Sequence, residues 1–166
     1  MNNTKLRRQA IGLLAGYALQ FLAGMLLNLF VTIPTKHPGD SGSNYLARSW
    51  HSLVWTLSGH GGWELAFHVY LGCLLVVGSI SLFTGAAIRH NTKWLVAGGV
   101  AALFTIGAFF NGMSFIDFNK DISSMIMATC WLAAVSSLVA ACVLKAKSSE
   151  RTNLGLESYK KLPRDV

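Results

Sequence analysis

The chain has 166 residues, of which 52% are apolar and only 13% are charged, and its formal net charge is +7. Soluble domains carry about 25% charged residues, so this composition excludes an ordinary water-soluble domain and indicates an integral membrane protein. The basic residues are grouped in alternate segments between apolar runs, which is typical of membrane topology. We therefore expect no nucleic-acid partner.

Apolar runs divide the chain into four segments, at about residues 10–33, 62–88, 94–113 and 122–144. Each is close to the roughly 20 residues that a helix needs to cross about 30 Å of hydrocarbon. The first run follows a basic segment, as in a cleavable signal peptide, but it continues to Pro34 and is too long for one. We expect an all-α integral membrane protein, an up-down four-helix transmembrane bundle, with residues 1–147 forming one four-span domain.

The connection between the first two runs is expected to contain an outer interfacial helix at about residues 43–58. Apolar residues recur there at helical spacing, and Trp50 and Trp55 suit the headgroup layer. The outer connection at residues 111–124 is expected to be a loop that folds back onto the bundle. The tail, residues 148–166, is polar and is expected to be disordered.

Charge placement predicts the orientation of the chain. Eleven of the fourteen basic residues fall before the first run, between the second and third, or after the fourth. The positive-inside rule therefore places the N-terminus, the turn at residues 89–93 and the C-terminus in the cytoplasm, and we expect the cell membrane to be the location.

Polar residues inside the spans are the candidate functional residues, because ionisable groups are costly in hydrocarbon. His60, Glu64 and His68 recur at i, i+4 and i+8, which spreads them over about 80° of one helical face. His68 lies six residues beyond Gly62, or about 9 Å into the apolar layer at 1.5 Å per residue. Gly16, Gln20, Gly24 and Asn28 recur every four residues in the first span and form a stripe of small and amide residues suited to helix packing. Asn28 lies six residues before Pro34 and is therefore expected at a depth similar to that of His68, so the two side chains could meet.

This pattern favours an outward-facing pocket of His60, Glu64 and His68, with Asn28 supporting it. Imidazole and carboxylate groups suit a divalent metal ion such as zinc, copper or iron. Further ligands would come from His51, Asp117 or Asp121. The spacing lacks the H-E-x-x-H arrangement of zinc proteases.

Two other ligands suit the same pocket. Haem b would use His68 with His51, His60 or a methionine as second axial ligand, although the other spans contain no histidine. Bound quinone or a proton path through Glu64 and His68 is the other alternative. No nucleotide or hydrolase fingerprint stands in a suitable context, so the sequence does not favour an enzyme.

A structural alternative remains open beside the pocket. Glu64 stands where the dipole of the second span favours a carboxylate, and His68 could bond Asn28 and hold two helices in register. The protein would then be a non-enzymatic accessory or assembly subunit, or a small transporter component. Its partners would be the lipid bilayer and other membrane subunits or further copies of itself. His37 and His90 lie in connections and are expected to be solvated.

Three segments carry a resemblance: GMLLNLFVTIPTKHPG from residue 24, HVYLGCLLVVGS from residue 68 and FNGMSFIDFNKDISS from residue 110. They resemble parts of uncharacterised small four-span membrane proteins of bacteria, and this resemblance implies no activity. The layout of four spans with an inward-facing histidine is also similar to b-type membrane cytochromes. Those proteins place histidines on more than one span, whereas this chain does not.

Overall fold

The computed structural model describes residues 3–34, 36–37, 43–118 and 120–160, and the side chains within residues 4–144. This part of the chain is all-helical and contains no strand. It forms five helices: α1 (Asn3–Phe30), α2 (Tyr45–Leu57), α3 (Trp63–Ile88), α4 (Thr92–Phe118) and α5 (Asp121–Lys160). Four stretches are long and apolar enough to cross a membrane: Thr4–Phe30, Trp63–Ile88, Thr92–Phe118 and Asp121–Leu144. The predicted all-α class and the four apolar helices are confirmed.

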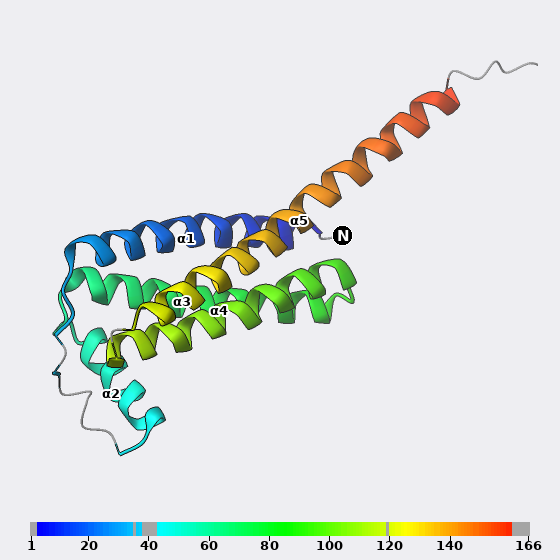
Figure 1. Ribbon diagram of the computed structural model, residues 1–166. Helices are drawn as coiled ribbons and strands as arrows, with labels where there is room; N and C mark the ends of the chain where they lie inside the picture. The colour runs from blue at the N-terminus through cyan, green and yellow to red at the C-terminus, as the bar shows by residue number, and fades with distance from the viewer. Residues whose placement is uncertain (1–2, 35, 38–42, 119, 161–166) are drawn as a thin grey trace, which may run out of the picture.

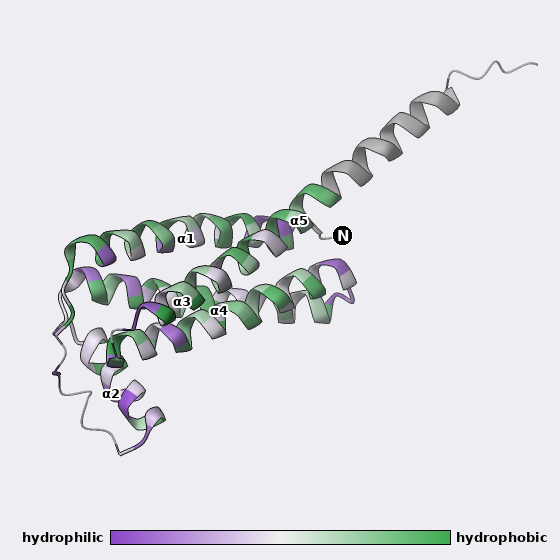
Figure 2. Ribbon diagram, in the orientation of Figure 1, coloured by the Kyte–Doolittle hydropathy of each residue, from purple (hydrophilic) through white to green (hydrophobic). Residues whose placement is uncertain are grey.

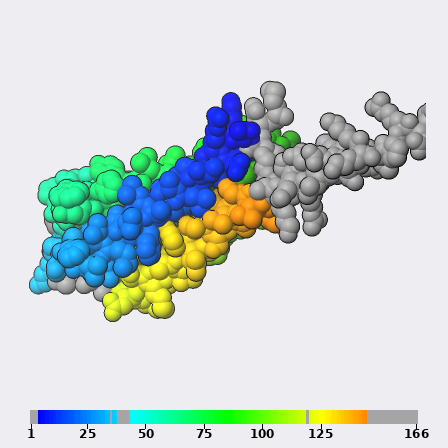
Figure 3. Space-filling model, turned by 90° about the horizontal axis from the view of Figure 1, so that it is seen from above, coloured from blue at the N-terminus to red at the C-terminus, as the bar shows by residue number. Residues whose placement is uncertain are grey.

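The four long helices lie side by side, and α2 packs at one end, against α3 and α4 (Figure 1). Apolar residues run along all four long helices, and hydrophilic residues gather in α2 and at the turn between α3 and α4 (Figure 2). On the face shown in Figure 3, α1 and the first part of α5 run next to each other. We call the end that holds α2 the outer end and the end that holds the α3–α4 turn the inner end.

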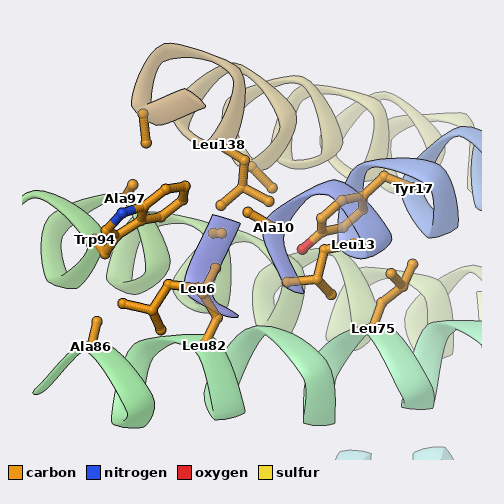
Figure 4. Close-up of a cluster of buried hydrophobic side chains, with 13 residues drawn as sticks. Leu6, Ala10, Leu13, Tyr17, Leu75, Leu82, Ala86, Trp94, Ala97 and Leu138 are labelled. Carbon is orange, nitrogen blue, oxygen red and sulfur yellow. The ribbon is translucent and has the colours of Figure 1, made fainter. Parts of the chain in front are cut away.

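The inner half of the helices encloses the larger core (Figure 4). Large side chains from three helices, among them Leu6, Leu82 and Leu138, meet around Trp94, which is 1% exposed. Small residues let the backbones approach closely: a Cβ placed on Gly98 of α4 would lie 3.2 Å from backbone atoms of Phe83 in α3. Close approach through small residues is the usual way in which helices associate in lipid.

A second, smaller core lies at the outer end and joins α2 to the long helices. It contains Leu53 of α2, Leu65 and Val69 of α3, and Met113 and Ile116 of α4. Asn44 is the N-cap of α2, and its side-chain oxygen accepts a hydrogen bond of 3.0 Å from the Ala47 amide. This N-cap satisfies one of the free donors of the first turn.

Helix boundaries differ from the sequence prediction at two outer connections. The fourth helix of the chain, α4, continues to Phe118, and α5 begins at Asp121, so most of the segment expected to loop back over the bundle is helical. Asp117 does not end the helix, because partners on α2 satisfy its carboxylate. The first helix ends at Phe30, four residues before Pro34.

The C-terminal segment is only partly described. The helix α5 is assigned as far as Lys160, its side chains are described up to residue 144, and residues 161–166 lie outside the described part. The expected cytoplasmic tail at residues 148–166 therefore stays a prediction.

Candidate functional site

The candidate site centres on a pair of polar side chains between α1 and α3. Nε2 of Gln20 lies 3.0 Å from Nε2 of His68, in a partly buried contact between the two helices. An amide nitrogen can only donate, so the ring nitrogen of His68 accepts and the ring proton is assigned to Nδ1. Gln20 therefore holds the imidazole in one orientation, and this tautomer belongs to the assigned orientation of the amide.

Two polar atoms of this pair have no hydrogen-bond partner among the described residues. Oε1 of Gln20 and Nδ1 of His68 are both buried and make no hydrogen bond within the described residues. In the assigned tautomer these are one acceptor and one donor. A buried polar atom without a partner costs about 1–3 kcal/mol, so the pair is only half satisfied.

Glycines create the room for this contact. A Cβ on Gly24 would lie 3.1 Å from Cε1 of His68, and one on Gly72 would lie 3.5 Å from Nε2 of Gln20. One turn before Gln20, a Cβ on Gly16 would lie 2.9 Å from the Leu75 side chain. The expected stripe on α1 therefore does face α3, and its glycines allow the close approach.

Asn28 does not have the role expected for it. Among the described residues Gln20, two turns earlier on α1, is bonded to His68, and Asn28 is exposed. The antiparallel register explains the difference, because Gly24 lies beside His68 and Gly16 beside Leu75. This register places Asn28 level with the first turn of α3, beyond the imidazole. The sequence prediction counted the depth of Asn28 from Pro34 and therefore placed Asn28, and not Gln20, level with His68.

The other two members of the predicted triad lie elsewhere. His60 is exposed and precedes α3, which begins at Trp63. The backbone at Gly62 has φ of 97°, which breaks the helical spacing that was to place His60 one turn from Glu64. Glu64 is half-buried in the first turn of α3. Across the described part of the chain, no three His, Cys, Asp or Glu side chains are grouped so that they could hold a metal ion.

The proposed additional ligands are also dispersed. His51 is exposed on α2, and Asp121 is exposed at the start of α5. Asp117 is 8% exposed and accepts hydrogen bonds from two serines of α2. The hydroxyl of Ser49 donates to Oδ2 at 3.1 Å, and that of Ser52 donates to Oδ1.

Ser49 and Ser52, which bond the candidate residue Asp117, were not singled out from the sequence. Together with Thr56 they form a stripe of buried hydroxyl residues along α2, at spacings of three and four. This stripe could have been recognised in the sequence, because hydroxyl residues at helical spacing can donate hydrogen bonds to a buried carboxylate as well as to water.

His37 contradicts the expectation that it is solvated. It is 9% exposed, its Nε2 lies 3.3 Å from the carbonyl oxygen of Ile116, and its ring stacks on Trp55 with 4.8 Å between the centroids. This contact ties the connection after α1 to both α2 and α4. His90, in the turn between α3 and α4, is exposed as expected.

A further polar contact crosses the middle of the long helices. The hydroxyl of Tyr17 in α1 bonds that of Thr105 in α4, and Nε1 of Trp131 in α5 donates to the Tyr17 carbonyl oxygen at 2.9 Å. The three helices are thereby linked at one residue of α1. Cys73, Cys130 and Cys142 are free and half-buried, and none of them belongs to these contacts.

Four long apolar helices joined by internal polar contacts indicate a multi-pass membrane protein. Comparisons with protein-family models, with curated proteins and with solved structures found no match for this chain.

Proposed function

We propose that the chain is a four-span protein of the cell membrane with both termini in the cytoplasm. The charges of the described residues support this orientation. Lys5, Arg7 and Arg8 stand at the start of α1, and Arg89 and Lys93 flank the turn at the same inner end, whereas Glu64, Asp117 and Asp121 stand at the outer end. Basic residues are retained on the cytoplasmic side of membrane proteins.

Within that membrane, we propose a non-enzymatic role as an accessory or assembly subunit, in which the polar residues hold the helices together. The single observation that carries this proposal is the bond between Gln20 and His68, which joins α1 to α3 inside the apolar layer. The buried carboxylate of Asp117 is used in the same way, to attach α2 to α4. Gln20, His68 and Asp117 thus each have a partner in this chain.

The proposal predicts association with another membrane subunit or with further copies of the chain. The protein would be extracted from its own membrane in a mild detergent, and the mass of the complex would be measured. We expect an assembly larger than one chain. Extraction as a monomer under conditions that preserve known complexes of the same membrane would contradict an accessory role.

A second candidate function is the binding of a metal ion or haem b at His68. One observation favours it: Nδ1 of His68 is buried without a partner in the described residues. This nitrogen can coordinate a metal in the tautomer that carries the ring proton on Nε2, with the Gln20 amide turned so that its oxygen accepts that proton. An absorption spectrum and elemental analysis of the purified protein separate the two candidates. A Soret band or a stoichiometric metal that disappears in His68→Leu and persists in the matched control His51→Leu would favour the cofactor and contradict the purely structural role.

A further inference from the structure

The side of α2 that packs on the protein carries buried hydroxyl residues beside Leu53, and three large apolar residues of the helix face outward. Leu46, Trp50 and Val54 stand at i, i+4 and i+8, and their exposed fractions are 68%, 63% and 45%. We call these three residues the outer apolar face. On the opposite side of the helix, Ser49 and Ser52 are at most 2% exposed. A helix on the surface of a soluble protein has the reverse arrangement.

Contacts at the middle and at both ends of α2 fix this orientation. Ser49 and Ser52 bond the buried carboxylate of Asp117. At the start of the helix, the Tyr45 hydroxyl donates to the Phe110 carbonyl oxygen at 3.4 Å. At its end, the Tyr70 hydroxyl donates to the Leu57 carbonyl oxygen at 3.1 Å. Rotating α2 to bury its apolar side would break these bonds, so the outer apolar face is held outward.

The end of α2 is bonded to a side of α3 that faces lipid if α3 spans the membrane. Trp63, Phe67 and Tyr70 of α3 are exposed along one side of that helix, and Tyr70 is the residue that bonds the end of α2. In Figure 1, α2 lies beside the outer ends of α3 and α4. An apolar surface that joins a lipid-facing one is itself suited to acyl chains.

We propose that α2 is embedded in the outer leaflet, with Leu46, Trp50 and Val54 among the acyl chains near the headgroups. The occupant of the outer apolar face is thus phospholipid. The indole of Trp50 suits this depth because it combines a large apolar ring with one donor for the polar layer. The inference rests on the proposed insertion of the four long helices, and it adds a fifth, non-spanning contact with the bilayer.

Tryptophan fluorescence in vesicles of phosphatidylcholine brominated on the acyl chains tests this placement. The emission of Trp50 is obtained as the difference between the wild-type chain and Trp50→Phe, a conservative change at an exposed position. We expect this difference emission to lie at short wavelength and to lose most of its intensity in brominated vesicles compared with unbrominated ones. Acrylamide, a quencher dissolved in water, should have little effect on it.

Other outcomes would overturn the proposal in distinguishable ways. Emission at long wavelength that acrylamide quenches would place Trp50 in water. Emission protected from both quenchers would mean that a protein partner or a second copy covers the outer apolar face. Trp63→Phe is the matched control, because Trp63 is 74% exposed at the start of α3. If the emission of Trp63 is quenched by brominated lipid and that of Trp50 is not, the inference about α2 fails while membrane insertion stands. If neither is quenched, insertion fails as well.

Discussion

The bond between Gln20 and His68 predicts an energetic coupling that can be measured with a double-mutant cycle. The perturbation consists of Gln20→Leu, His68→Leu and the combination of the two. Leucine removes the hydrogen-bonding groups and leaves an apolar side chain at each position. Either single substitution leaves the other buried polar group without its partner, so each is expected to destabilise the protein by about 1–3 kcal/mol.

The magnitude of the coupling follows from the membrane environment. Hydrogen bonds between helices in lipid contribute about 0.6 kcal/mol on average and at most about 1.7 kcal/mol, because the separated helices also find partners. The double variant should therefore be less destabilised than the sum of the single variants by about 0.6–1.7 kcal/mol. Each single substitution already removes one of the two orphaned atoms, Oε1 of Gln20 or Nδ1 of His68, so their removal is additive and cancels from the coupling.

The assay is equilibrium unfolding of the purified protein in mixed micelles, with an increasing fraction of a denaturing detergent, followed by circular dichroism. The matched control is the cycle of Asn28→Leu with His68→Leu, since Asn28 is an exposed amide on the same helix. Its coupling should lie within about 0.3–0.5 kcal/mol of zero. A coupling near zero for Gln20 with His68, or an equal coupling for Asn28, would refute the assigned register between α1 and α3.

Three further predictions concern other contacts. Gly24→Ala should be less stable than Gly12→Ala in the same detergent titration. Both variants gain the helix propensity of alanine, but the new Cβ at residue 24 meets the His68 ring at 3.1 Å, whereas nothing lies within 4 Å of the one at residue 12. Asp117→Ala should leave the hydroxyls of Ser49 and Ser52 unpaired and loosen the attachment of α2. Amide hydrogen exchange should then become faster only at residues 45–57, and unchanged exchange there would contradict this attachment. Trp131→Phe should cost about 0.5–1.5 kcal/mol in thermal or detergent unfolding, because it removes one donor to α1, and no loss would mean that this bond is energetically neutral.

The spans could be predicted from the sequence because they depend on a local property. A run of apolar residues long enough to cross hydrocarbon identifies a helix without reference to its neighbours. The stripe of Gly16, Gln20, Gly24 and Asn28 could also be recognised, since small and amide residues at a spacing of four mark a helix-packing face, although Asn28 at its end is exposed. Both expectations agree with the structure at the level of helices and faces.

The partner of His68 could not be predicted in the same way, because it depends on the axial register of two antiparallel helices. A shift of two turns between α1 and α3 replaces Asn28 by Gln20 as the bonded amide. The loss of His60 from the predicted triad has a more local cause, the positive φ of Gly62, which separates it from α3. A glycine permits such a turn but does not require it.

The orientation of α2 is the clearest case in which the sequence was insufficient. Its periodicity correctly predicted an amphipathic helix, and the structure gives its bounds as Tyr45–Leu57. Which side faces the bundle depended on Asp117, a residue more than sixty positions away that had been assigned to a loop. Trp55, expected in the headgroup layer together with Trp50, instead stacks on the buried ring of His37.

The sequence by itself determined that this chain is helical, that four of its helices are apolar enough to cross a membrane, and that polar residues gather toward one end. Those properties follow from composition and from periodicity along the chain. Only the tertiary structure decided which polar groups meet, as in the pairing of Gln20 with His68 and of Asp117 with Ser49 and Ser52. The physical reason is that a hydrogen bond requires atoms within about 3 Å, and that distance depends on helix register and rotation, which long-range packing fixes.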